Sequence, residues 1–399
     1  MKIRVLAILC FGAFVFFGAP SCEEIVVGEE EEQSYFMKFY GDYHSDYLCD
    51  ISANDVEEII LTGYRKTSEN DRGWLIKTNS NGMVDWEKEF YSGTNTRTFG
   101  LHADETIRCA GFAEVTGSLL KEGFLCNYSY DGELLDSIPF SLQADAVKDM
   151  KFLQHGDNLR VMVHAHAGGS DQVYLYELTN GGELRKLSSN PLNAEMEGRL
   201  YFYEEENGDI YLAGSPKEAD EDGQTNIMVS RLVDDNILWS YPYGEPGQIE
   251  KASGIVHYGD KLYIAVTAYA ENDLLQPYTY LLTLNSYGVD ADTTHVQLTG
   301  NNEAFSMIHH QDNQFVMVGK QVWDNKNSDV FMSIITTGGN MLLEQSYGNK
   351  GTSIGKFVKK LQGEANGFII AGDIATSALS PDAVDVLVIK ADENGEWIE

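Results

Sequence analysis

The pattern of apolar and polar residues along this chain repeats seven times. Each repeat has an apolar run that usually ends in a small residue, a polar loop, a second apolar run and a tight turn. The ends of the first runs are 48 to 53 residues apart, and the turns keep nearly the same spacing. Two landmarks that share one period indicate a repeat architecture. The first runs end at Gly63, Gly111, His164, Gly214, Val266, Gly319 and Gly372.

The apolar runs predict β-strands. They are short, rich in Ile, Val, Leu, Tyr and Phe, and separated by Gly, Asn and Asp, as strands usually are. Pairs such as Asn81-Gly82 and Asp131-Gly132 accept the positive φ of a tight hairpin. Each unit has room for two further strands, for example at 86–91 and 97–102. Four strands per unit correspond to one blade of a β-propeller.

The predicted fold is therefore an all-β, seven-bladed propeller of four-stranded blades over residues 34–399. The last unit stops short of a complete outer strand, whereas a surplus strand precedes the first unit at 36–41. We expect this N-terminal strand to complete the last blade, because that would close the ring and cover two sheet edges.

The N-terminus has the pattern of a signal peptide over residues 1–21. Lys2 and Arg4 precede an uncharged, mainly apolar stretch at 5–19 that is short for a membrane span. Ala19-Pro20-Ser21-Cys22 resembles a bacterial lipobox with Cys22 as the lipidated residue, although Ala19 stands where Leu is usual. Ordinary cleavage after Ser21 or a cytosolic start are the alternatives.

Residues 22–33 are acidic and predict an unstructured tether. Acidic residues after a lipidated cysteine resemble the surface-export signals of lipoproteins in the Bacteroidetes. That resemblance implies an outer-membrane protein, anchored only through Cys22 and exposed at the cell surface.

Charge narrows the range of partners. The formal net charge is −34, with acidic residues spread over most loops. Binding to nucleic acid is disfavoured because the basic surface that phosphates require is absent.

The repeat resembles one found in propellers secreted by bacteria, which reads roughly GYILAG…LIKTDSNGNVLWSKTYG. The likeness is clearest in GWLIKTNSNGMVDWEKEFY at 73–91, in GFIIAG at 367–372 and in LVIKADENGEW at 387–397. It covers nearly the whole mature chain. The resemblance implies a β-propeller but no particular chemistry, since propellers serve many functions.

The sequence contains no recognisable catalytic motif, so we predict no catalytic residue, no cofactor and no metal. His102, His155, His257 and His310 occupy equivalent predicted turns and are expected to be turn residues. His164 and His166 lie on one face of a strand, but no further zinc ligand is indicated. The acidic loop at 220–223 lacks EF-hand spacing. Cys109 and Cys126 are expected on neighbouring strands, either bridged or as buried free thiols.

The loops expected at one mouth of the central channel carry aromatic residues that suit recognition of a sugar or peptide. The alternative is that these side chains pack the loops together. The main hypothesis is a non-enzymatic surface lipoprotein that binds a glycan or an envelope protein. The alternatives are a carbohydrate-active hydrolase with its site at the channel mouth and a purely structural subunit. The candidate residues are Tyr43, Tyr64, Tyr243, Tyr269, Trp323 and Tyr347.

Overall fold

The structure is a computed structural model that describes most of the unit formed by residues 34–399. The predicted signal peptide, Cys22 and the tether lie outside the described residues. So do Tyr43 and the acidic loop at 220–223. The described residues are 35–397 except 42–43, 91–92, 116–120, 157, 180, 193, 218–224, 271–272, 325–326, 349–350, 362–365 and 376–383.

The described residues form 28 β-strands and no helix, and therefore no helix that could cross a membrane. Five sheets have four antiparallel strands each, in chain order. The first contains β2 (Ser45–Ala53), β3 (Ile59–Lys66), β4 (Asp71–Thr78) and β5 (Val84–Phe90). The second contains β6 (Thr96–Ala103), β7 (Ile107–Glu114), β8 (Lys121–Tyr128) and β9 (Leu134–Leu142). The third contains β10 (Ala146–His155), β11 (Asn158–Ala167), β12 (Ser170–Leu178) and β13 (Leu184–Pro191).

The remaining strands follow the same order. The fourth sheet contains β14 (Met196–Glu204), β15 (Ile210–Pro216), β16 (Ile227–Val233) and β17 (Asn236–Tyr243). The fifth contains β18 (Gln248–Tyr258), β19 (Lys261–Ala270), β20 (Asp273–Asn285) and β21 (Asp292–His295). The sixth sheet has eight strands: β22 (Asn301–Gln311), β23 (Gln314–Asp324), β24 (Asn327–Thr336), β25 (Met341–Tyr347), β26 (Thr352–Lys360), β27 (Gly367–Ala375), β28 (Asp385–Asp392) and β1 (Phe36–Tyr40).

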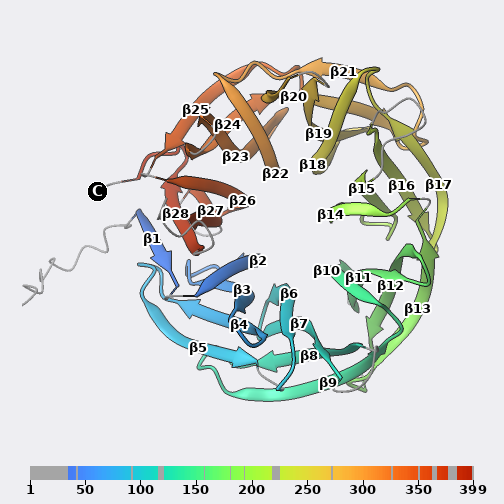
Figure 1. The fold of residues 1–399 in the computed structure, drawn as a ribbon, viewed down its shortest axis with the longest axis vertical. Coiled ribbons are helices and arrows are strands. Elements are labelled where there is room, and N and C mark those ends of the chain that lie inside the picture. The colour runs from blue at the N-terminus through green and yellow to red at the C-terminus, as the bar shows by residue number, and fades with distance from the viewer. Residues whose placement is uncertain are drawn as a thin grey trace, which may run out of the picture. The chain divides into compact units, whose positions relative to one another are not determined.

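The prediction of an all-β fold built from four-stranded antiparallel units is confirmed by these sheets. Figure 1 shows them arranged around a common axis, with the first strand of each unit innermost. Each innermost strand contacts the next one along the chain, and β26 contacts β2. The innermost strands are β2, β6, β10, β14, β18, β22 and β26.

The eight-stranded sheet differs from the predicted set of separate blades. Among the described residues, its two halves are paired through one parallel residue pair, Ser328 of β24 with Thr352 of β26. In the second half, β1 pairs with β28 over five antiparallel residue pairs, from Phe36 opposite Lys390 to Tyr40 opposite Val386. Strands from the two ends of the described chain therefore share one sheet.

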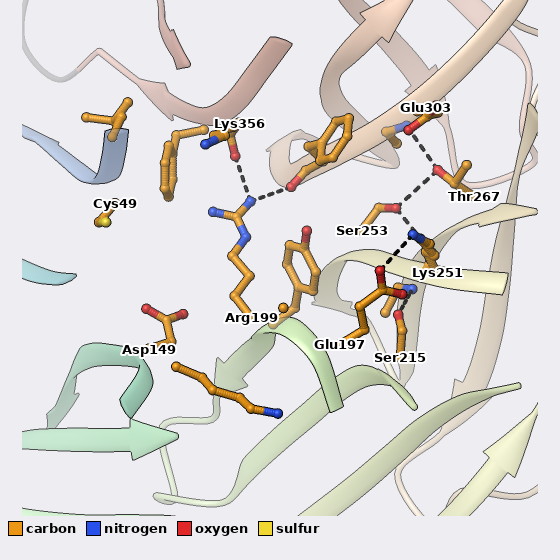
Figure 2. A pocket seen from close by; sticks show the side chains of 18 of the residues that line it. Cys49, Asp149, Glu197, Arg199, Ser215, Lys251, Ser253, Thr267, Glu303 and Lys356 are labelled. Atoms are coloured by element: carbon orange, nitrogen blue, oxygen red, sulfur yellow. Dashed lines mark hydrogen bonds and ion pairs between the residues drawn. The ribbon is translucent and has the colours of Figure 1, made fainter. Parts of the chain in front are cut away.

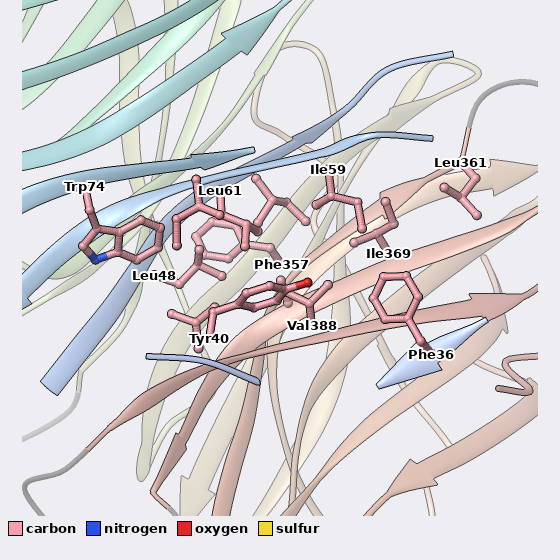
Figure 3. Close-up of a cluster of buried hydrophobic side chains, with 14 residues drawn as sticks. Phe36, Tyr40, Leu48, Ile59, Leu61, Trp74, Phe357, Leu361, Ile369 and Val388 are labelled. Carbon is pink, nitrogen blue, oxygen red and sulfur yellow. The ribbon is translucent and has the colours of Figure 1, made fainter. Parts of the chain in front are cut away.

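The core lies between neighbouring sheets. The second and third strands of each unit are buried along most of their length, as in β4, because both faces of the sheet are covered. The outer strand β5 is largely exposed. One buried cluster joins β1 to the first and last units and includes Phe36, Tyr40, Trp74 and Phe357 (Figure 3).

The glycine that ends four of the first apolar runs has a steric cause. Gly372 in β27 lies opposite Gly355, where the inner strand β26 has an irregular register. A Cβ atom at Gly372 would overlap the carbonyl oxygen of Ile354. Gly63, Gly111 and Gly319 would each overlap a carbonyl oxygen of their own inner strand in the same way. The repeat therefore selects glycine where two backbones approach closely.

We expect Gly372→Ala to lower the free energy of unfolding by about 2 kcal/mol or more, because β26 would have to move away. Gly338→Ala is the matched control, since the nearest atom to its new Cβ would be 3.6 Å away and its φ is not positive. Urea denaturation of both variants measures the difference. Equal stabilities would contradict the steric explanation.

Candidate functional site

The inner strands share an irregularity that points side chains toward the axis. Each of the seven shifts register against its neighbour in the first part of the strand, so that extra residues on the inner strand oppose one residue on the second strand; β22 has another shift between His309 and Gln311. Such β-bulges redirect side chains and are frequent beside active sites. They lie between Leu48 and Asp50, Thr98 and Gly100, Val147 and Asp149, Glu197 and Tyr201, Ala252 and Gly254, Ala304 and Ser306, and Gly355 and Phe357.

The bulged residues meet around one cavity. Its volume is about 450 Å³, within the usual range for a small-molecule site. Residues near the start of the inner strands and the end of the second strands complete its wall. The bulged residues that line it are Cys49, Phe99, Lys148, Gly198, Arg199, Ser253, Phe305 and Lys356.

Arg199 extends across the cavity from the fourth unit (Figure 2). Its Nη2 donates hydrogen bonds to the carbonyl oxygens of Phe305, at 2.6 Å, and Lys356, at 2.7 Å. The guanidinium lies over the rings of Tyr201 and Phe357, 4.9 and 4.5 Å from the ring centres. A second cavity of about 210 Å³ is lined by the same three side chains. Arg199, Tyr201 and Phe357 therefore separate two cavities along the axis.

Asp149 is the most unusual carboxyl group of the site. It is 5% exposed and lines the larger cavity. Its Oδ1 accepts the backbone N–H of Met150 at 2.9 Å, whereas Oδ2 has no hydrogen-bond partner among the described residues. The nearest lysine nitrogen, Nζ of Lys151, is 3.9 Å from Oδ1. Burial raises the pKa of this carboxyl group, which favours the protonated form.

The three lysines and two glutamates that line the cavity each pair with an oppositely charged side chain. Lys251 lies 3.2 Å from Glu197, and Lys148 lies 2.9 Å from Asp171. Lys356 pairs with Asp373. Glu303 is paired with Lys320 at 2.9 Å. Three carboxyl groups, those of Asp149, Glu197 and Glu303, thus line the same cavity in different surroundings.

Aromatic side chains from the first and fifth units line the cavity. Tyr47 and Tyr64 stack with their ring centres 5.1 Å apart. Tyr269 lies in the wall with the Lys251 ammonium 5.9 Å from its ring. Burial raises the pKa of Tyr64 to about 12 and also raises that of Tyr269. Both phenols are therefore neutral hydrogen-bond donors near neutral pH.

The structure brings together two of the aromatic residues proposed from the sequence, Tyr64 and Tyr269. Trp323 lies elsewhere; it is 60% exposed, and its indole donates a hydrogen bond to Asp329. Sequence analysis missed Arg199 and Asp149. No motif contains them, and their common position depends on bulges that the sequence pattern does not reveal.

Tyr243 and Tyr347, two of the candidate residues from the sequence, do not line the cavity. The hydroxyl of Tyr243 donates to the carbonyl of Gly288 in the next unit at 2.5 Å, and that of Tyr347 donates to the carbonyl of Gly395 at 2.8 Å. Tyr347 is only 3% exposed. Both residues lie on outer strands, where they hold neighbouring units together, because their hydroxyls reach the hairpin turn of the following unit.

The histidines do not converge on a metal. His102 and His310 pack against Phe152 and Phe368 of neighbouring units. His164 and His166 each lie 2.9 Å from a different oxygen of the buried Asp171. Within the described ranges, no group of three or more histidine, cysteine, aspartate or glutamate residues could hold a metal ion.

Cys109 and Cys126 lie directly opposite each other on β7 and β8. Both are buried, and both thiols are free in this structure.

Comparisons with known proteins give a fold and no family. No family model matches the chain. No curated protein matches it either.

Solved structures match over almost the whole chain. The polysaccharide lyase Uly1 matches with a TM-score of 0.54 and 10% identity, over 92% of this chain and 94% of the other. YCF48 with a bound D1 peptide matches with a TM-score of 0.52 and 9% identity, over 91% and 97%. At such low identity, these likenesses show a shared propeller-like fold.

The likeness to the lyase corrects the prediction that the protein is not an enzyme. That prediction rested on the lack of a recognisable motif. A structure of the same fold, matched along nearly its full length, is an enzyme. The missing motif therefore does not exclude catalysis, and the protein belongs among all-β propeller-like structures whose members include an enzyme acting on polysaccharide.

Proposed function

We propose that this protein is a carbohydrate-active propeller whose site is the cavity lined by the bulged residues of the inner strands. The observation that carries this proposal is the buried Asp149, whose carboxyl group has a pKa raised by burial and lines a cavity of ligand size together with other carboxylates. Glycoside cleavage commonly uses one protonated and one ionised carboxyl group on the two sides of the scissile bond. The likeness in fold to a polysaccharide lyase supports this class of substrate.

In this proposal Asp149 protonates the leaving oxygen. A general acid with a raised pKa keeps its proton at the pH at which ordinary carboxyl groups have lost theirs. Glu197 is the carboxylate best placed as the base, because its side chain is 55% exposed and open to an incoming water. Tyr47, whose ring stacks on Tyr64, offers an aromatic surface for a sugar ring.

The proposal is tested by incubating the purified mature protein with a panel of neutral and acidic polysaccharides and measuring the reducing ends released. We expect turnover of at least one member, together with binding of the same polymer in affinity electrophoresis. A protein that neither cleaves nor binds any member of a broad panel would contradict the proposal.

We also propose that the unit is a seven-bladed ring, with the eight-stranded sheet counted as two blades and β1 as the outer strand of the last. Tyr40 in β1 supports this count, because its hydroxyl bonds to the Gly82 carbonyl at 2.8 Å, as Tyr243 bonds to Gly288 and Tyr347 to Gly395. The last unit would thus meet the first in the same way as other neighbours meet.

For the N-terminus we propose a lipoprotein of the kind that its sequence resembles, anchored at Cys22 on the cell surface. Cys22→Ala should release the protein from the membrane fraction and abolish incorporation of labelled fatty acid. Cys49→Ala serves as the control, since Cys49 lies in the propeller cavity. Labelled fatty acid that persists in Cys22→Ala would show that this cysteine is not the anchor.

A further inference from the structure

The repeat is broken most strongly at the start of β14. Other inner strands carry one extra residue in their bulge, but here the register passes from Glu197 directly to Tyr201, opposite Ser215 and Ala213. Residues 198–200 therefore oppose Gly214 alone. Gly198 has a φ of 72°, a conformation that favours glycine. This wider bulge carries Arg199 to the backbone of the sixth and seventh inner strands.

Arg199 interacts with the carboxylates of Asp149 and Asp50 only at longer range than an ion pair. It is half-buried, and no carboxylate of the described part of the chain forms an ion pair with it. Its Nη2 is occupied by two neutral carbonyl oxygens, which leaves the hydrogens of Nη1 and Nε outside these bonds. The lysines of the cavity differ in this respect, because Lys148, Lys251 and Lys356 are each paired with a carboxylate.

The cavity is also richer in cations than the protein as a whole. Four of its lining residues are basic and three are acidic, whereas the chain has 28 basic and 62 acidic residues. Glu197 and Glu303 are paired with Lys251 and Lys320, and burial raises the pKa of Asp149. An anion that enters this cavity therefore meets Arg199 as the one basic side chain of the described wall that has no ion-pair partner within 4.0 Å.

We infer that Arg199 binds an acidic group of the glycan, a carboxylate or a sulfate, so that the substrates are anionic polysaccharides. The inference rests on the proposed function and names its substrate class. A planar guanidinium that stacks on aromatic rings is held in a defined orientation, and its N–H groups can bind a carboxylate or sulfate through two parallel hydrogen bonds. The rings of Tyr201 and Phe357 provide that support.

The test measures binding of three probes by affinity electrophoresis: polygalacturonate, dextran sulfate and neutral dextran. Arg199→Gln is compared with wild type and with the control Arg185→Gln. Arg185 lies on the outer strand β13, is 65% exposed and pairs with Glu177. We expect wild type and Arg185→Gln to bind at least one anionic probe, and Arg199→Gln to bind it at least about tenfold more weakly. Preference between the two anionic probes identifies the carboxylate or the sulfate as the recognised group.

Two further measurements keep the outcome interpretable. The melting temperature of Arg199→Gln shows whether this variant folds. Arg199→Lys keeps the positive charge but removes the paired N–H donors of the guanidinium, so it tests whether those donors are needed. Wild-type protein is also tested with carboxyl-reduced polygalacturonate, which should bind as weakly as dextran. Equal binding of neutral and anionic probes, or unchanged anion binding by a folded Arg199→Gln, would overturn the inference and leave the proposed function intact. Failure of wild type to bind any glycan would overturn both.

Discussion

Deletion of residues 34–41 is expected to unfold the propeller at temperatures that wild type withstands, whereas deletion of residues 23–33 should leave its melting temperature nearly unchanged. The first deletion removes β1, which pairs with β28 through all five of its residues. It also removes Phe36 and Tyr40, both 8% exposed and part of the cluster between the first and last units. Burial of two such side chains contributes roughly 3–6 kcal/mol, a large part of an ordinary protein's stability.

A point variant tests the packing of Phe36 while the strand β1 stays in place. Phe36→Ala should cost about 3–5 kcal/mol, the usual range for a buried phenylalanine. Phe39→Ala is its control on the same strand, because Phe39 is 46% exposed. Thermal unfolding followed by circular dichroism measures all four proteins. Equal melting temperatures for the two deletions would show that β1 does not hold the ring together.

Asp149→Asn should reduce turnover of the polysaccharide substrate by about 10²–10⁴-fold, the usual contribution of a general acid. Asn keeps the shape of the protonated carboxyl group, so the substrate should still bind. Asp145→Asn is the control. Asp145 directly precedes the same strand, β10, is exposed to solvent, and accepts the Gly168 N–H at 3.1 Å. A kcat for Asp149→Asn within twofold of wild type would remove Asp149 from the mechanism.

The same substitution has a stability signature. The pKa of Asp149 is raised in the folded protein, so the folded state holds its proton more tightly than the unfolded state. At low pH the carboxyl group is protonated in both the folded and the unfolded state, so its raised pKa does not change the free energy of unfolding there. As the pH rises above the ordinary aspartate range, the unfolded chain ionises first and wild type loses stability until the folded pKa is passed. We expect Asp149→Asn to be more stable than wild type at neutral pH but not at low pH, as measured by melting temperature at both.

The strands and their grouping could be predicted because they depend on local patterns. Alternating and continuous apolar runs reveal strands, and Gly82 and Gly132, which have φ values of 69° and 80°, mark hairpins by residue type. No glycine marks the turn between β16 and β17, where the positive φ values fall on Asp234 and Asp235. Type and order of elements were predictable, whereas single residues at their ends were not.

The cavity could not be predicted in the same way. Whether an aromatic residue faces a ligand or a neighbouring unit depends on packing between segments far apart in the sequence. Tyr64 and Tyr347 both follow apolar runs, yet the first lines the cavity and the second is buried against Gly395. Asp149 and Arg199 acquire their character from burial and from partners more than 100 residues away, such as Phe305 and Lys356 for Arg199.

Because of the bulges in the inner strands, side chains that line the cavity can change without altering the pairing of the strands that carry them. A bulged residue such as Ser253 or Phe305 lies outside the paired register of its sheet. Its side chain can therefore be exchanged with little change to the ladder hydrogen bonds, and in the sixth unit Gly319, opposite Ala304, keeps room for the backbone. A scaffold of this kind allows selection to alter one wall position at a time. Related chains with the same repeat are then expected to share strands and turns but to differ in specificity, residue by residue, around the axis.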